Sequence, residues 1–246
     1  MKKVLLVPDS HWPNVDIRAW RLMLKVAHDL RPETIVTLGD LFDFATVSSH
    51  AKSAKERGQN LIDEVVSSTP ALNDLDKIPG VRTKIFIEGN HEFRFDRYIN
   101  DRAPELFGVT SVDKLFRLKQ RGWKFVPYKQ HFKLGEIWLT HDLGKAGQNA
   151  HRDAALKFGG NAVIGHTHRL AYEVRGSAQG KPHVAAMFGW LGDPKAATYM
   201  HSINATVDWA LGFGVAYVRE NGYTYITPVP ILPDYSVVVN GKLFKG

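Results

Sequence analysis

The sequence predicts a single α/β domain over residues 1–246, folded as a two-sheet sandwich. In the first half, short apolar runs alternate with stretches of helical periodicity, which is typical of a parallel sheet covered by helices. The second half is richer in short strands and contains two hairpin signals, so its sheet is expected to be mixed or antiparallel. No repeat, low-complexity tract or Pro/Gly/Ser-rich linker marks a boundary between domains.

The first half has a strand–helix–strand rhythm. Its apolar runs stop at Pro8-Asp9 and Gly39-Asp40, as buried parallel strands stop at turns. Strands are expected at residues 4–7, 34–38 and 84–87, and helices at residues 17–30 and 61–75. Pro70 falls inside the second helical pattern and is expected to bend or divide that helix.

The second half is expected to contain one helix among several strands. The strands are predicted at residues 123–128, 137–140, 162–164, 171–175 and 183–188, and the helix at residues 146–158. Asn221-Gly222 and Asn240-Gly241 predict two-residue hairpin turns. The stretch 189–214 mixes Trp, Tyr, His and Gly with little periodicity, so we expect it to form a substrate-selecting loop.

The composition is that of a globular protein, with 44% hydrophobic and 23% charged residues. No apolar run approaches the roughly 18 residues needed to cross a membrane. The N-terminal apolar run stops at Pro8, short of a secretory signal, and is interpreted as a buried strand. The absence of Cys excludes disulfides, thiolate ligands and a cysteine nucleophile, which fits a reducing compartment, and we expect a cytoplasmic location.

The chain is basic, with a formal net charge of +7 and a pI of about 9.5. A basic surface attracts phosphate-bearing ligands, nucleic acid among them. The positive residues are scattered from Lys2 to Lys245 without a consecutive block. Charge alone therefore favours a basic enzyme without a nucleic-acid partner.

Polar residues follow at least five of the predicted strands. They are Asp9 and His11, Asp40 and Asp43, Asn90 and His91, His141, and His166 and His168. Ligands of open α/β sheets bind outside the carboxyl ends of the strands, so the fold would gather these residues in one place. Carboxylate, amide and imidazole groups together suit divalent cations, and a carboxylate can bridge two of them.

Five sequence blocks in a fixed order carry a family resemblance. They are Asp9-x-His11, Gly39-Asp40-x-x-Asp43, Gly89-Asn90-His91-Glu92, a lone strand-end His141, and Gly165-His166-x-His168. This ordered set resembles the signature of the calcineurin-like metallophosphoesterase superfamily and spans residues 9–168. The resemblance implies an αββα sandwich of the metallophosphoesterase type and a dinuclear metal-dependent phosphoesterase.

The resemblance also implies a role for each block. The first metal would be held by Asp9, His11 and His168. The second would be held by Asn90, His141 and His166, with Asp40 bridging both ions. The nucleophile would be a hydroxide that bridges the two ions. Manganese is the favoured metal, with iron, zinc, magnesium, nickel or cobalt as alternatives.

Two further residues would act beside the metals. His91 would lie just outside the cluster and protonate the leaving oxygen or stabilise transition-state charge. Asp43 would hydrogen-bond His91 and select its tautomer. Each block also has a simpler interpretation: Asp9, Asp40 and Asp43 as helix N-caps, Asn90 as a turn residue, and His166 and His168 as a solvated pair.

His141 departs from the family pattern because Asp142 follows it where Gly is usual. Asp142 would accept a hydrogen bond from a ligand histidine, approach the metals, or begin the next turn. His131 and His151 are rivals for the same ligand position. Neither ends an apolar run, so His141 is preferred.

The substrate is expected to be a phosphodiester, a nucleotide or nucleic acid. Asp43-Phe44-Ala45 stands where the phosphoprotein-phosphatase branch has Asp-Arg-Gly, which argues against that branch. Arg94 would contact phosphate from a new position, or else be a solvated residue at a helix start. Trp12, Trp190 and Trp209 would stack bases near the site, or else fill the core. The alternatives are a phosphomonoesterase, a non-catalytic scaffold that keeps the fold, and a nucleic-acid-binding module.

Overall fold

A computed structural model describes residues 1–49, 58–178, 180–196 and 208–246. In these residues six strands form the larger sheet in the order β11-β10-β1-β2-β3-β4. The strands are β1 (Lys2–Val7), β2 (Thr34–Thr37), β3 (Thr83–Ile87), β4 (Trp123–Val126), β10 (Gly212–Val218) and β11 (Thr224–Pro230). Strands β1 to β4 pair in parallel, as the first half of the sequence predicts. The hairpin β10–β11 joins the same sheet through an antiparallel pairing of β10 with β1.

The smaller sheet has the order β5-β6-β7-β9-β8 in the described part of the chain. Its strands are β5 (Phe132–Leu134), β6 (Ile137–Thr140), β7 (Asn161–Ile164), β8 (Leu170–Arg175) and β9 (His183–Phe188). Strands β6, β7 and β9 are parallel, whereas the two edge strands run antiparallel to their neighbours. This is the mixed sheet expected of the second half.

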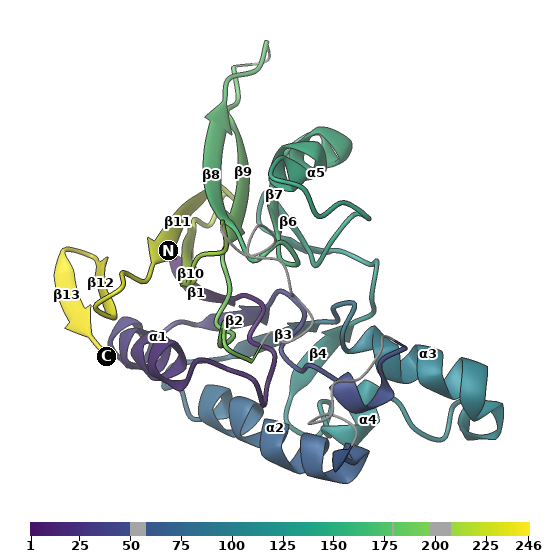
Figure 1. Ribbon diagram of the computed structural model, residues 1–246. Helices are drawn as coiled ribbons and strands as arrows, with labels where there is room; N and C mark the ends of the chain where they lie inside the picture. Colours follow the sequence, from purple (N-terminus) through teal and green to yellow (C-terminus); the bar gives the residue numbers. More distant parts are fainter. Residues whose placement is uncertain (50–57, 179, 197–207) are drawn as a thin grey trace.

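The helices cover the outer faces of the two sheets (Figure 1). They are α1 (Ile17–Leu30), α2 (Leu61–Asp76), α3 (Phe93–Arg102), α4 (Val112–Leu115) and α5 (Ala150–Phe158), with 3₁₀ turns η1 (Ala45–Val47) and η3 (Pro104–Leu106). Helix α1 begins where the Asp16 side chain accepts the N–H groups of Arg18 and Ala19.

Two helical expectations are corrected by the structure. Helix α2 is not divided at Pro70, because Ala71 and Leu72 beyond it are buried in the core and hold the last turns in place. Helix α5 begins at Ala150, not at residue 146, and the Ala150 N–H bonds to the Gly147 carbonyl in a turn that precedes the helix.

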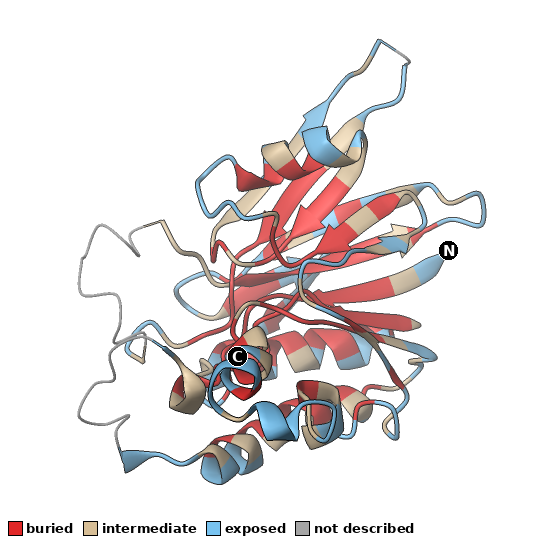
Figure 2. Ribbon diagram, turned by 90° about the vertical axis from the view of Figure 1, so that its right-hand side faces the viewer, coloured by how far each residue is buried: buried red, intermediate tan, exposed pale blue. Residues whose placement is uncertain are grey.

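Three apolar layers hold the αββα sandwich together, and the buried residues follow both sheets in Figure 2. Alternation along β1 shows the arrangement: Leu5 and Val7 face the helices, while Val4 and Leu6 face the smaller sheet. A third cluster joins α5 to the outer face of the smaller sheet. The α/β two-sheet fold class is therefore confirmed.

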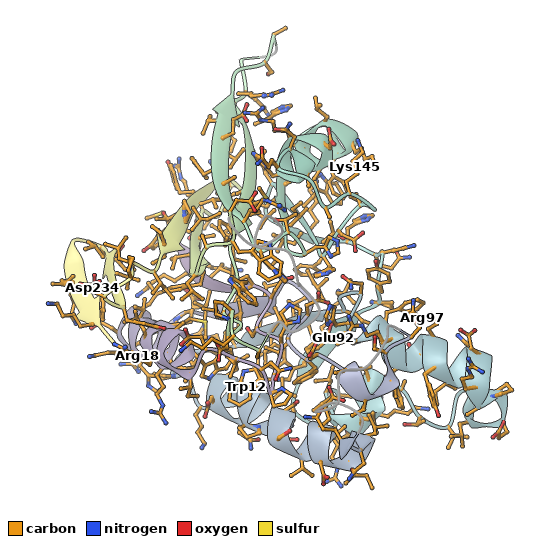
Figure 3. All side chains as sticks on the ribbon, in the orientation of Figure 1. Trp12, Arg18, Glu92, Arg97, Lys145 and Asp234 are labelled. Atoms are coloured by element: carbon orange, nitrogen blue, oxygen red, sulfur yellow. The ribbon has the colours of Figure 1, made fainter. Side chains whose placement is uncertain are left out.

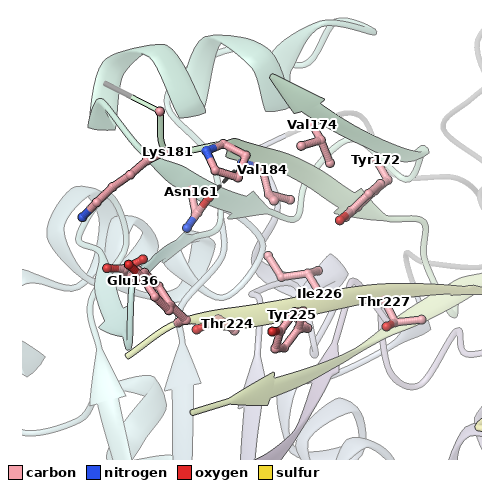
Figure 4. A pocket seen from close by; sticks show the side chains of 13 residues that line it. Glu136, Asn161, Tyr172, Val174, Lys181, Val184, Thr224, Tyr225, Ile226 and Thr227 are labelled. Carbon is pink, nitrogen blue, oxygen red and sulfur yellow. Dashed lines mark hydrogen bonds between the residues drawn. The ribbon is translucent and has the colours of Figure 1, made fainter. Parts of the chain in front are cut away.

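A cavity of about 570 Å³ lies where the edges of the two sheets meet (Figure 4). Tyr172, Tyr225 and Ile226 form part of its apolar lining, and Asn161 and Lys181 lie at one end. Because Asn161 begins β7 and Lys181 precedes β9, this cavity is at the amino ends of these strands. No helix among the described residues has the length and apolar character required to span a membrane.

Candidate metal centre

The five polar blocks converge where β1, β2, β3, β6 and β7 end. Three sets of described side chains each bring three possible ligand atoms within 4.8 Å of one another. The sets are Asp9, His11 and His168; His11, Asp40 and His91; and Asp40, His141 and His166. Figure 3 shows Glu92, which belongs to one of the five blocks, near the middle of the molecule, whereas Lys145 and Asp234 lie towards its edges.

The first set faces a common point. The Nε2 atoms of His11 and His168 are 2.9 Å apart, and His168 Nε2 is 3.6 Å from Asp9 Oδ1. All three residues are buried, and His11 and His168 have positive φ angles of 50° and 57°. Non-glycine residues seldom adopt this backbone conformation, which recurs at functional sites where side chains are aimed by the fold.

The set of Asp40, His141 and His166 lies around the amide of Asn90. Asn90 Oδ1 is 2.9 Å from His141 Nε2 and 2.7 Å from His166 Nδ1. His141 donates its other ring N–H to the Leu38 carbonyl at 2.8 Å, which fixes the tautomer that leaves Nε2 directed at the site. An amide oxygen and two imidazole nitrogens thus meet at one position.

Asp40 belongs to two of the three sets, and it links His11 and His91 to His141 and His166. Its Oδ2 is 3.3 Å from His141 Nε2 and 3.9 Å from His91 Nε2, and its Oδ1 accepts the His91 backbone N–H. The loops approach closely because Gly89 has no side chain: a Cβ there would overlap the Asp40 carboxylate. Gly39 likewise leaves room for the ring of His141.

His91 forms a linked group with Asp43 and Arg94. Its Nδ1 donates to Asp43 Oδ1 at 2.7 Å, and its Nε2 accepts from Arg94 Nη2 at 2.9 Å. Arg94 also donates to the Asp43 carbonyl and is only 9% exposed, so the interpretation of Arg94 as a solvated residue is wrong. The ring of His91 lies 4.5 Å from that of His11.

The charges of the site favour a cation. Burial raises the pKa of the Asp9 carboxyl to about 7, and the nearby Asp40 charge raises it too. Burial would also raise the pKa of Asp40, but His141 and His91 hold it well below its usual range. For His141, burial acts downward, yet the Asp40 carboxylate outweighs it and raises the pKa to about 10. Positive charge at this position is therefore stabilised by both carboxylates.

The donor set fits divalent metal binding. Asp9 Oδ2 is buried and has no hydrogen-bond partner in the residues that the structure describes. A buried carboxylate oxygen without a partner is costly, and a metal ion would satisfy it. The residues offered are carboxylate, amide and imidazole groups, which are usual ligands for Mn²⁺, Fe²⁺ and Zn²⁺.

The positions of Asp9, Asp40 and Asp43 exclude the simpler interpretation of these residues as helix N-caps. Neither Asp9 nor Asp40 begins a helix, and the Asp43 carboxylate accepts from Asn14 and His91 instead of capping a turn. Of the two rival histidines, His131 packs against Trp138 and Phe158, and His151 lies in α5 beside Glu173. His141 is the histidine that enters the cluster.

Asp142 and Trp12 are both buried. Asp142 is buried and accepts from the Gly144 N–H, so it begins the next turn. Trp12 packs against Trp20 in the core.

Residues 197–207 of the expected loop 189–214 lie outside the described residues, and residues 212–214 belong to β10.

Glu92 is a structural residue of the site that sequence reasoning did not assign. Its fully buried carboxylate accepts the backbone N–H groups of Asp40, Phe42 and Gly89. Burial raises the pKa of Glu92 to about 7, and the Asp40 charge adds to this effect. The sequence signal for this role is an acidic residue directly after Gly89-Asn90-His91. Two of the three hydrogen-bond partners of Glu92 lie 50 or more residues away in the chain, so the signal does not identify them.

No model of a protein family matches the sequence. Two curated relatives are similar to almost the whole chain. The Gene 54 protein of Mycobacterium phage D29 is 26% identical over an alignment 263 residues long, which covers 98% of this chain and 95% of the relative. The Gene 54 protein of Mycobacterium phage L5 is 25% identical over 247 residues, which cover 88% and 89%.

Several solved structures are similar in fold. A Vps29 from Entamoeba histolytica has a TM-score of 0.47 at 14% identity, covering 98% of this chain and 95% of its own. The E. coli phosphoesterase YfcE has a TM-score of 0.43 at 16% identity, covering 96% and 97%. A dimetal phosphatase from Danio rerio has a TM-score of 0.42 at 12% identity, covering 89% and 93%.

Proposed function

We propose that this chain is a calcineurin-like phosphoesterase that binds two divalent cations and hydrolyses phosphoesters. One observation carries the proposal: the buried Asp40 carboxylate shares one group of possible ligand atoms with His11 and His91 and another with His141 and His166. Asp9, His11 and His168 would hold one cation, and Asn90, His141 and His166 the other. When bound, the two cations would neutralise phosphate charge and make water a better nucleophile near neutral pH.

The side chains beside the ligands would bind and orient the substrate. Arg94 Nη2 and His91 Nε2 are 2.9 Å apart, so both would reach the same phosphoryl or leaving-group oxygen. Arg94 supplies a fixed positive charge there, and His91 supplies a proton when it is charged. Asp43 holds His91 Nδ1 from the other side, which directs Nε2 towards the substrate.

Phosphodiesters are the substrate class we favour, with nucleotides or nucleic acid as natural examples. The net charge of +7 attracts polyanions, and Trp209 is half-buried against His168, close to the proposed first cation. No arginine follows Asp43, where phosphoprotein phosphatases carry one. Manganese is the metal we favour, and the combination of oxygen and imidazole ligands also suits iron and zinc.

The test is a pair of assays on protein first stripped of metal with a chelator. Hydrolysis of bis-p-nitrophenyl phosphate and of p-nitrophenyl phosphate is measured before and after Mn²⁺ is restored. We expect Mn²⁺-dependent turnover that is faster on the diester and absent in Asp40→Asn. Faster turnover of the monoester would instead identify a phosphomonoesterase. Bound Mn²⁺ without turnover would identify a scaffold, and oligonucleotide binding that survives chelation would identify a binding module.

A further inference from the structure

The ring of His168 is enclosed by two tryptophans. The Trp190 indole stacks on it with a centroid distance of 4.8 Å and an interplanar angle of 12°. The Trp209 indole meets it edge to face, at 4.1 Å and 82°. The two indoles also contact each other at 4.7 Å, so they form a continuous aromatic corner around the imidazole.

His168 lacks the usual means of orienting a ligand histidine. A metal-binding histidine generally donates its second ring N–H to a carbonyl or carboxylate, as His141 does to Leu38. The Nδ1 atom of His168 is buried and has no hydrogen-bond partner in the described ranges of the chain. The orientation that aims its Nε2 at His11 and Asp9 therefore depends on packing.

The backbone holds both tryptophans in place. Trp190 donates its backbone N–H to the Ala210 carbonyl, and Ala210 donates to the His168 carbonyl, each at 3.0 Å. On the other side of Trp209, the Asp208 carboxylate is paired with Arg169, the residue that follows His168. Trp209 is thus fixed from both sides to the segment that contains His168.

We propose that Trp190 and Trp209 are positioning residues that orient His168 for the first cation, a role that rests on the proposed metal centre. The stacked and the edge-on indole together enclose the imidazole on two sides, which would restrict its rotation about the Cβ–Cγ bond. Trp190 also lies 6.2 Å from the ring of His11, so it borders both histidines of the first cation. Loss of a hydrogen-bonded orienting partner lowers metal affinity by about 10- to 100-fold in other metal sites, and we expect a loss of the same order for these packing partners.

The chain offers a matched control. Trp138 packs against His131 at 4.9 Å, which reproduces an indole–imidazole contact away from the metal centre. Trp209→Ala and Trp209→Phe are compared with Trp138→Ala, and Trp190→Phe serves as the milder change at the buried position. Thermal unfolding of each variant separates loss of packing from loss of metal binding.

The experiment is an Mn²⁺ titration followed by electron paramagnetic resonance, which counts free Mn²⁺. We expect two ions per wild-type chain, and in Trp209→Ala an affinity about 10- to 100-fold lower for one of them. Trp209→Phe should recover most of that affinity, and Trp138→Ala should bind like the wild type. Two ions bound by Trp209→Ala with wild-type affinity would overturn the proposal. Because the titration measures bound metal, its result is independent of whether the protein hydrolyses a phosphoester.

Discussion

Glu92 accepts the backbone N–H of Asp40 through its Oε2 atom at 2.9 Å, and the same oxygen accepts the N–H of Gly89. Its Oε1 accepts the N–H of Phe42 at 2.8 Å. One buried carboxylate therefore ties the loop after β2 to the loop after β3. Because Asp40 has a positive φ of 51°, these bonds hold a backbone conformation that its sequence alone does not favour.

Glu92→Gln should destabilise the protein by about 1–3 kcal/mol, because its amide NH₂ would replace one acceptor and face a backbone N–H. Urea unfolding in metal-free buffer measures the change directly. Glu105→Gln, at an exposed position, serves as the control and should leave the unfolding midpoint unchanged. An equally stable Glu92→Gln variant would show that this carboxylate does not hold the two loops.

Asp40→Asn should reduce metal binding more than His11→Ala does. Asp40 is the carboxylate that approaches both sets of ligands, whereas we assign His11 to the first cation only. We expect weakened binding of both ions in Asp40→Asn and of one ion in His11→Ala. Metal analysis after gel filtration measures this, and two ions with wild-type turnover in Asp40→Asn would exclude the bridging role.

His91→Ala should keep both ions and lose turnover by about 10²- to 10⁴-fold if His91 is the general acid. The loss should be smaller for p-nitrophenyl esters, because their leaving group needs little protonation. Steady-state rates on activated and unactivated esters provide the comparison. Equal losses on both would assign His91 to binding phosphate charge, and an unchanged rate would remove it from the mechanism.

Asp43→Asn should lower turnover by about 10- to 100-fold and still bind two ions at saturating Mn²⁺. Asp43 Oδ1 is 2.7 Å from His91 Nδ1 and 3.6 Å from His11 Nδ1, so the substitution would disturb two histidines and not only His91. Kinetics and metal counting on the same sample test this. Binding of fewer than two ions at saturation would make Asp43 a ligand.

Asp76 should make stability depend on pH below neutrality. Burial acts to raise the pKa of Asp76, but hydrogen bonds from Lys84, Arg121 and Trp123 outweigh it and lower that pKa in the folded state. Its contribution is therefore present above the unfolded pKa of roughly 3.9 and is lost as the pH falls through the folded value.

Asp76→Asn should accordingly be less stable than the wild type at pH 7, with a difference that shrinks towards pH 3. Urea unfolding at both pH values measures the difference. Asp101→Asn, at an exposed position of α3, is the control. A difference that stays constant with pH would show that the hydrogen bonds to Asp76 do not depend on its charge.

The sequence by itself determined the strand–helix order of the first half and the place of the polar blocks. Asp9, Asp40 and Asn90 each follow an apolar run, and parallel strands bring their carboxyl ends to one edge. The hairpin turns at Asn221-Gly222 and Asn240-Gly241 were also predictable, because such dipeptides favour local backbone conformations. These features depend on residues close together in the chain.

Only the tertiary structure decided the partners of the side chains that surround the metal centre. Glu92 with Asp40, Arg94 with Asp43, and Trp209 with His168 are each separated by about 40 to 50 residues. The antiparallel pairing of β10 with β1 joins segments more than 200 residues apart. Local periodicity reports which face of an element is buried, whereas the partner on that face is set by how the sheets and helices pack together.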